Sequence, residues 1–169
     1  MKEIIERYKS GVKSVIKRIT GKYNEDLEQE VFVNVWKNRE KYSESGRFRQ
    51  WINAIAANVS RDYMKSKGFK SEQNKADGVF PEDVDAKSFV TPESEFEKFE
   101  RQKAVSLAIS ELSPKLRAAI VMYEIDGMSY AQIAEASKCT EGTVKSRLFA
   151  ARRELFKKLE KYITKGELL

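Results

Sequence analysis

The stretch Thr140–Leu155, TEGTVKSRLFAARREL, decides how the C-terminal part of this chain folds. A helix turns by about 100° per residue, so most apolar side chains of this stretch fall on one narrow stripe. Phe149 points in nearly the opposite direction, among basic and hydroxyl side chains. The pattern therefore predicts an amphipathic helix that packs on a core and leaves one aromatic ring exposed. The apolar stripe consists of Val144, Leu148, Ala151 and Leu155.

The residues before this helix predict a helix-turn-helix. Ser129 and Gln132 have the spacing of a capping box, which opens a short helix over residues 130–136. A tight turn follows, and Ala134 supplies the small side chain that two steeply crossing helices need. Thr140 opens the second helix, whose first residues are small or hydroxylated, so that its backbone can approach DNA phosphates. Such a helix fits the major groove.

We interpret the exposed Phe149 as a DNA contact. Its aromatic edge can touch a thymine methyl group, while Lys145 and Ser146 can reach base edges or phosphates. The alternative is that Phe149 packs on a neighbouring helix, and the capping, turn and charge patterns around it argue against this. Because many regulators carry a helix-turn-helix, the rest of the chain has to decide the function.

Composition restricts the class of protein. The chain has 169 residues, a net charge of +6, a single cysteine (Cys139) and no histidine. One cysteine forms no internal disulfide, and without histidine the commonest general base and transition-metal ligand is missing. No apolar run approaches the roughly 18 residues of a membrane span, and the N-terminus lacks the apolar stretch of a signal peptide. We expect a cytoplasmic protein with no membrane insertion, metal or cofactor.

Charge is distributed unevenly along the chain. Residues 138–165 contain nine basic and three acidic residues, whereas residues 76–97 contain seven acidic residues against Lys87 alone. A basic balance indicates nucleic acid or another anionic surface as a partner.

Helical spacing of apolar residues extends over most of the chain, and no segment alternates like a strand. Residues 68–92 have no sustained period and hold two glycines and two prolines, which predicts a flexible linker. The sequence therefore predicts an all-α protein with two small helical domains, residues 1–67 and 93–169. The expected helices are residues 2–20, one that begins at Asn24 or Glu25, residues 49–67, residues 93–111, and one from Ser113–Pro114, with Ser as the cap, to Gly127.

Three stretches resemble the sigma-70 family of transcription initiation factors. DLEQEVFVNVW (Asp26–Trp36) and FRQWINAIAANVSRDYMK (Phe48–Lys65) resemble region 2, and residues Leu112–Leu159 resemble region 4. With only these two regions and a short linker, the chain is similar to the extracytoplasmic-function (ECF) class. The resemblance implies a region 2 helical bundle and a region 4 helix-turn-helix that read the −10 and −35 promoter elements.

The resemblance implies that the helix at Asp26–Trp36 docks on the β′ clamp helices of the RNA polymerase core. Taken alone, its carboxylates also fit a helix N-terminus and a solvated face. A metal or acid–base site there is disfavoured, because nothing around the carboxylates supplies a nucleophile or histidine. The implied docking residues are Asp26, Gln29, Glu30 and Asn34.

For the −10 element, the resemblance implies that the loop Tyr42–Phe48 captures a flipped base and that the third helix assists strand opening. The basic and aromatic side chains of this loop and helix suit single-stranded DNA. For Trp51 we favour a place in the core. The implied −10 residues are Tyr42, Ser45, Gly46, Arg47, Phe48, Asn58, Arg61 and Lys65.

For the −35 element, the resemblance places the last helix on duplex DNA. Ala150 stands where relatives often have arginine, so a base-reading arginine is missing. Lys138 replaces the usual turn glycine, and a left-handed conformation there costs roughly 1 kcal/mol. The implied −35 residues are Thr140, Gly142, Thr143, Lys145, Ser146, Phe149, Arg152 and Arg153.

The implied partners are the RNA polymerase core (β′ clamp helices and β subunit), promoter DNA and an anti-sigma factor. The acidic linker either occupies a nucleic-acid channel of the polymerase or is a solvated tether. For Cys139, a buried turn position is favoured over a redox sensor. Two other functions are disfavoured. The chain has no surplus helix through which a stand-alone regulator would dimerise. It also lacks the cluster of catalytic side chains that a nucleic-acid-processing enzyme needs. We expect a monomer that is not an enzyme.

Overall fold

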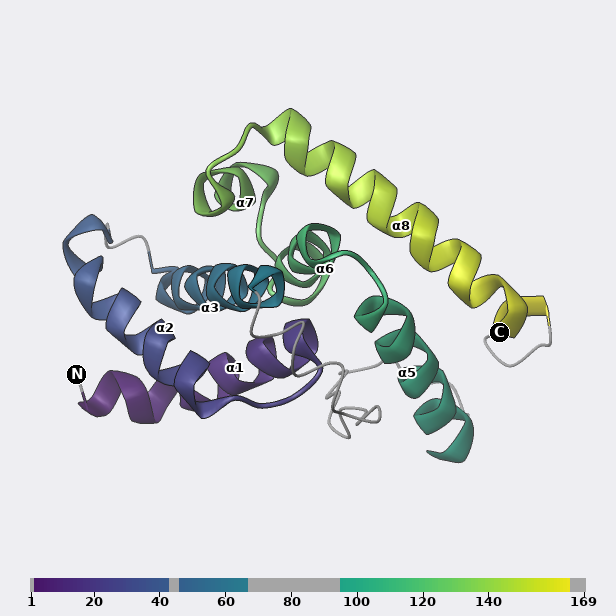
Figure 1. Ribbon diagram of the computed structural model, residues 1–169, viewed down its shortest axis with the longest axis horizontal. Helices are drawn as coiled ribbons and strands as arrows, with labels where there is room; N and C mark the ends of the chain where they lie inside the picture. The colour runs from purple at the N-terminus through teal and green to yellow at the C-terminus, as the bar shows by residue number, and fades with distance from the viewer. Residues whose placement is uncertain (1, 43–45, 67–94, 165–169) are drawn as a thin grey trace.

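The computed structural model describes residues 2–42, 46–66 and 95–164, and every regular element within these ranges is helical (Figure 1). The predicted linker at 68–92, and with it most of the acidic segment, lies outside the described residues. The helices form an N-terminal group, α1–α3, and a C-terminal group, α5–α8. No helix of the described ranges is both long and apolar enough to cross a membrane.

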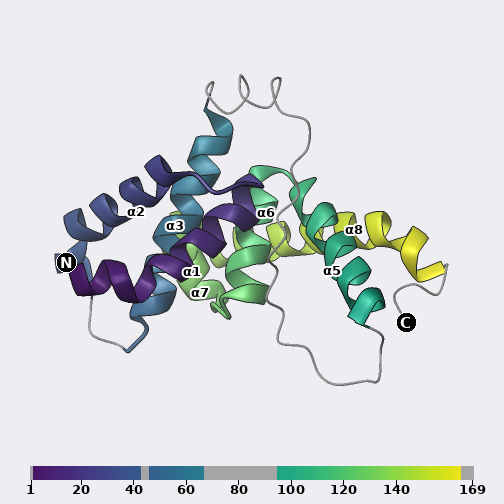
Figure 2. The same cartoon turned by 90° about the horizontal axis from the view of Figure 1, so that it is seen from below.

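The N-terminal group consists of α1 (Lys2–Thr20), α2 (Glu25–Lys37) and α3 (Phe48–Lys65), which all contact one another (Figure 2). A short 3₁₀ turn, Arg39–Lys41, follows α2. The predicted start of α2 is confirmed, because the side chain of Asn24 accepts a hydrogen bond from the Leu27 amide at 3.2 Å. α3 begins one residue earlier and ends two residues earlier than the predicted range 49–67.

The C-terminal group consists of α5 (Glu95–Ser110), α6 (Pro114–Ile120), α7 (Tyr130–Ser137) and α8 (Glu141–Thr164). Pro114 opens α6 as predicted, but the Ser113 side chain makes no capping hydrogen bond, so that part of the prediction is wrong. The sequence also did not predict that α6 continues as a π-helical turn, η2 (Val121–Ile125). Gly127 adopts the expected left-handed conformation, with φ of 65°.

The helix-turn-helix is built as the sequence predicts. Both hydrogen bonds of the capping box between Ser129 and Gln132 are present at the start of α7. Lys138 has φ of 51° and is the only described residue other than glycine with a positive φ. Its left-handed conformation turns the chain between α7 and α8, and Thr140 Oγ1 then accepts a hydrogen bond from the Thr143 amide at 3.2 Å.

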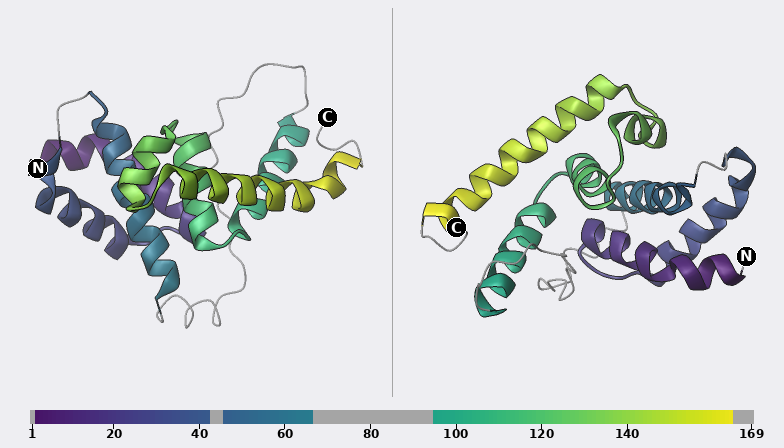
Figure 3. Two further views of the ribbon diagram at one scale, coloured as in Figure 1. Left: turned by 90° about the horizontal axis from the view of Figure 1, so that it is seen from above. Right: turned by 180° about the vertical axis from the view of Figure 1, so that it is seen from behind.

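The two groups share one continuous buried core. α3 packs against α6 and α7, and α1 packs against α5 and α6. The largest fully buried side chains come from both groups, for example Ile16 and Ile52 from the first and Met122 and Leu148 from the second. α8 lies along the outer side of the C-terminal group, away from α1 and α2 (Figures 1 and 3). The boundaries of the two predicted domains stay predictions.

Candidate nucleic-acid interface

The outer face of α8 is the most accessible part of the candidate interface. Val144, Leu148 and Ala151 are buried, as the apolar stripe predicts. Phe149 is 69% exposed, which agrees with the predicted direction of its ring. A large apolar side chain with that exposure stabilises the fold little, so it is available to a partner. The predicted DNA-facing residues Gly142, Lys145, Ser146, Arg152 and Arg153 are also exposed.

The first turn of α8 carries hydroxyl groups that are already ordered. The hydroxyls of Thr140 and Thr143 lie 3.0 Å apart, and Ser146 Oγ donates to the Thr143 carbonyl at 2.9 Å. Thr140 Oγ1 satisfies the Thr143 amide, and Thr140, Gly142 and the basic side chain of Lys145 are exposed around it. This end of a helix favours anions through its dipole, so it suits a DNA phosphate.

Two stacked rings with a cation at each end lie beside the outer face of α8. Tyr123 of η2 and Tyr130 of α7 are stacked, with ring centroids 5.2 Å apart. Lys145 Nζ lies 5.7 Å from the Tyr130 ring, and the Arg152 guanidinium lies 5.2 Å from the Tyr123 ring. Arg152 also pairs with Glu124, with Nη2 and Nε at 2.8 Å and 3.2 Å from Oε1.

The hydrogen bonds to Glu124 are the main reason that the pKa of Arg152 is raised. The pKa of Tyr123 is raised chiefly by its hydrogen bond with Tyr130. Sequence reasoning singled out Lys145 and Arg152 but missed Tyr123, Glu124 and Tyr130. No local pattern could have paired Arg152 with Glu124, because the two residues are 28 positions apart and meet only through the fold.

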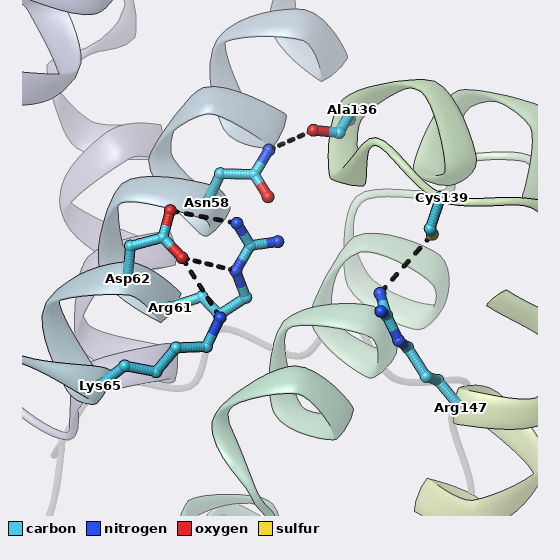
Figure 4. A network of polar contacts seen from close by, with 7 residues as sticks. All are labelled: Asn58, Arg61, Asp62, Lys65, Ala136, Cys139 and Arg147. Carbon is cyan, nitrogen blue, oxygen red and sulfur yellow. Dashed lines mark hydrogen bonds and ion pairs between the residues drawn. The ribbon is translucent and has the colours of Figure 1, made fainter. Parts of the chain in front are cut away.

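On α3, the predicted −10 residues are occupied by protein partners (Figure 4). Asn58 Nδ2 donates to the Ala136 carbonyl of α7 at 2.7 Å. Arg61 donates to both carboxylate oxygens of Asp62, at 2.9 Å and 3.1 Å, and Lys65 Nζ lies 3.4 Å from the same group. Burial acts to raise the pKa of Asp62, but the bonds and charges of Arg61 and Lys65 outweigh it and lower that pKa.

Four aromatic rings gather where the predicted base-capturing loop meets α3. Phe48 lies at the centre, with ring centroids 4.9 Å from Tyr42, 5.2 Å from Tyr8 and 5.4 Å from Trp51. Trp51 is partly buried against the core, which agrees with the interpretation favoured for it. Gly46 and Arg47 are exposed at the edge of this cluster, and Ser45 lies outside the described residues.

On α2, the predicted docking residues Asp26, Gln29 and Glu30 are exposed, and Asn34 is half-buried. The same helix exposes two large apolar side chains that the sequence did not single out, Val33 at 49% and Trp36 at 52%. The Arg39 guanidinium lies 4.2 Å from the centre of the Trp36 ring. The exposed face of α2 is therefore partly apolar as well as acidic.

Glu28 differs from the other acidic residues of α2, because it is buried and paired within the N-terminal group. It accepts a hydrogen bond from the Tyr23 hydroxyl at 2.9 Å, and Lys9 Nζ lies 3.4 Å from its other oxygen. Burial, and then the bond with Glu28, raise the pKa of Tyr23 to about 12. Glu28 therefore acts in the packing of the group.

Two buried polar side chains join the two groups, and sequence reasoning missed both. Arg117 of α6 donates to the Ile19 carbonyl of α1, and Asn53 of α3 donates to Asp126 at 2.9 Å. Arg117 is only 6% exposed, and burial lowers its pKa to about 10. Its guanidinium therefore stays charged at neutral pH.

Within the described ranges, no three His, Cys, Asp or Glu side chains are grouped so that they could hold a metal ion. Cys139 is a free, partly buried thiol in the turn, and Arg147 Nη1 lies 3.6 Å from its sulfur (Figure 4).

The order of the two helical groups matches two sequence families. The model for "Sigma-70 region 2" matches residues 4–69, and the model for "Sigma-70, region 4" matches residues 102–155. Together the two matches cover more than half of the chain. They coincide with the N-terminal group and with most of the C-terminal group.

Two bacterial sigma factors are similar to this chain along nearly its whole length. The ECF RNA polymerase sigma-E factor of Haemophilus influenzae is 29% identical over 167 residues, which cover 93% of this chain and 86% of the relative. That of Escherichia coli strain K12 is 28% identical and covers 95% of this chain and 86% of the relative. Among solved structures, the sigma factor RpoE of Bartonella quintana, in complex with the anti-sigma factor NepR, has a similar fold. Its TM-score is 0.62 at 24% identity, over 94% of this chain and 96% of that chain.

With both regions present in this order and on the expected helices, the chain belongs to the sigma-70 family of RNA polymerase sigma factors, in the ECF class.

Proposed function

We propose that this chain binds the RNA polymerase core and directs transcription initiation at promoters that it recognises through two elements. In this proposal α2 docks on the β′ subunit, α3 and the loop before it read and open the −10 element, and α8 reads the −35 element. The domain limits 1–67 and 93–169 belong to the same proposal. The protein acts in the cytoplasm, as a specificity factor and not as an enzyme.

The single observation that carries the proposal is the outer face of α8. Phe149 is 69% exposed between Lys145 and Arg152, in the first half of a helix whose opposite face buries Val144, Leu148 and Ala151. A ring in this position can contact a base edge while the cations and hydroxyls around it contact the phosphates of the two strands. Contact with DNA therefore suits this ring better than exposure to water does. The exposed Trp36 and Val33 give α2 the apolar centre that a protein-binding face needs.

Each domain contacts its DNA element only weakly, so the two contacts become effective only because one chain carries both domains. Binding of one element places the other domain at a high local concentration near its own element, so that weak contacts add up. Reading of the −10 element by Asn58 also requires that its amide leave the Ala136 carbonyl, to which it is bound at 2.7 Å. Docking of the two groups at separate sites on the polymerase would hold them apart.

The experiment is a competition for bacterial RNA polymerase core between the purified chain and a housekeeping sigma factor. We expect the chain to displace the housekeeping factor and to support transcription from a distinct set of promoter fragments. A chain that ignores the core and protects a symmetric duplex site as a dimer would contradict the proposal. In that case a stand-alone regulator takes its place.

We also propose that an anti-sigma factor controls this chain, since the similar Bartonella quintana structure is that of a sigma factor with such a partner. A purified anti-sigma factor from the organism that encodes this chain would then prevent the chain from binding to the core. Binding to the core that no such protein affects would contradict this part of the proposal.

A further inference from the structure

Arg152 is held from two sides by neighbouring residues of η2, which we call the η2 clamp: Tyr123 and Glu124. The Glu124 carboxylate accepts from Nη2 at 2.8 Å and from Nε at 3.2 Å, and the Tyr123 ring lies 5.2 Å from the guanidinium carbon. Tyr123 is itself stacked on Tyr130, with an interplanar angle of 18°. The guanidinium is therefore supported on one face and paired along one edge.

The η2 clamp lies beside the face of α8 that is proposed to enter the major groove. Lys145, Phe149, Arg152 and Phe156 are spaced by four, three and four residues, so they form one stripe along the helix. All four are exposed. The clamp thus acts on a residue in the middle of the recognition stripe.

A free arginine at such a position would bind any phosphate within reach, because its side chain is long and flexible. Glu124 competes with phosphate for the same N–H groups, and the Tyr123 ring limits the directions that the guanidinium can take. A planar fork with a fixed direction suits the paired acceptors of one base edge and discriminates among bases.

We propose that Tyr123 and Glu124 are positioning residues that make recognition of duplex promoter DNA by Arg152 selective. The pair restrains the guanidinium from unspecific phosphate binding and presents it in one direction. This inference rests on the function proposed above and adds two specificity-determining residues outside the helix-turn-helix.

The test compares the full chain and its variants on the RNA polymerase core. One measurement is the enrichment of sequences from promoter fragments with a randomised −35 segment. The other is the salt dependence of binding to a duplex without promoter sequence. For Glu124→Gln we expect about three- to tenfold tighter binding to the duplex without promoter sequence. The plot of log affinity against log salt concentration should become steeper by about one. The enrichment of sequences in the randomised −35 segment should be weaker. For Tyr123→Leu we expect weaker enrichment without tighter unspecific binding, because the Glu124 pair remains.

Glu111→Gln is the matched control. Glu111 pairs with Lys158, which lies on the opposite side of α8 from the recognition stripe, and its side chain is 49% exposed, the same fraction as that of Glu124. This variant should select the same sequences as the wild type, with the same salt slope. Thermal unfolding of each variant checks that the fold is kept, and Glu124→Gln is the decisive variant because its side chain is exposed.

A Glu124→Gln complex that matches the wild type in both enrichment and salt slope overturns the inference alone. A wild-type complex that enriches no sequence contradicts the proposed function, and the inference with it. Opposite changes in unspecific binding and in selectivity support the inference, because a merely structural defect would lower both.

Discussion

The two helices predicted to touch DNA, α3 and α8, present their faces in different states. On α3, Asn58 is bound to the Ala136 carbonyl at 2.7 Å, and Arg61 is paired with Asp62. On α8, Phe149 is 69% exposed. The comparison teaches that the C-terminal group covers Asn58 on one recognition face in this conformation and leaves the other face open at Phe149.

Two of the polar contacts between the two groups use carbonyls near helix C-termini as acceptors. The last carbonyls of a helix have no donor within the helix, so they bind side chains or water. Arg117 donates to Ile19 at the end of α1, to Ser110 at the end of α5, and to Leu112 at 3.0 Å. Asn58 donates in the same way to the Ala136 carbonyl, near the end of α7. The two groups are therefore joined by caps that one supplies to the other.

The largest effect is expected for Arg117→Ala, which would break this joint. The change leaves the carbonyls of Ile19, Ser110 and Leu112 without their donor and removes a buried side chain. Each buried acceptor left unpaired costs free energy, partly offset because a cation no longer has to be buried. We expect the free energy of unfolding to fall by about 3 kcal/mol, measured by denaturant titration with circular dichroism.

Arg7→Ala is the control for this substitution, because Arg7 lies on the exposed surface of α1. It should change the free energy of unfolding by less than about 0.5 kcal/mol. If Arg117→Ala behaves like Arg7→Ala, the two groups are not held together by these caps.

The next effect concerns the open face and should leave stability nearly unchanged. Phe149→Ala removes an exposed ring, so the free energy of unfolding should change by less than about 0.5 kcal/mol. We expect the affinity of the polymerase complex for its promoter to fall about tenfold, because a base contact is lost. Phe99→Ala, which removes a ring that is 51% exposed on α5, is the control for exposed aromatics and should bind DNA like the wild type. Equal affinities of the two variants would contradict the assignment of Phe149.

The open face could be predicted from the sequence, whereas the covered one could not. The direction of Phe149, the capping box at Ser129 and the left-handed Gly127 follow from local spacing and local backbone rules. The bonds of Asn58 to Ala136 and of Arg117 to Ile19 span 78 and 98 residues and depend on how whole helices pack. The fold class was therefore accessible to pattern analysis, but the partners of these polar side chains were not.

A smaller effect is expected in the turn between α7 and α8, where the sequence predicted a strained residue. Lys138 adopts φ of 51° and ψ of 53°, a conformation that costs an L-residue more than it costs glycine. Lys138→Gly should therefore raise the free energy of unfolding by about 1 kcal/mol, measured by thermal unfolding. Lys157→Gly, in the middle of α8, should instead destabilise the helix by about 1 kcal/mol. A loss of stability in Lys138→Gly would show that its side chain makes a contact worth more than the strain.

The smallest effect is a pH dependence at the joint between the groups. Burial raises the pKa of Asp126, against the opposing effects of its hydrogen bond from Asn53 and of the nearby charges of Arg18 and Arg49. Because the folded state binds this proton more tightly than the unfolded chain, the stability that Asp126 contributes is full in acid. It is lost as the pH rises through the folded pKa. Asp126→Asn does not titrate, so its stability relative to the wild type should increase from acid towards neutral pH, as thermal unfolding in a pH series would measure.

Asp62, an exposed residue of α3, provides a control of opposite sign. Although burial acts to raise its pKa, Arg61 and Lys65 lower it, so the stability that Asp62 contributes is present above its unfolded pKa and is lost as the pH falls through the folded value. Asp62→Asn should therefore be less stable than the wild type at neutral pH, and the difference should vanish in acid. If the stabilities of both variants relative to the wild type change in the same direction with pH, the burial of Asp126 does not distinguish the joint between the groups from the exposed ion pairs of Asp62. The joint would then be held by geometry and not by charge.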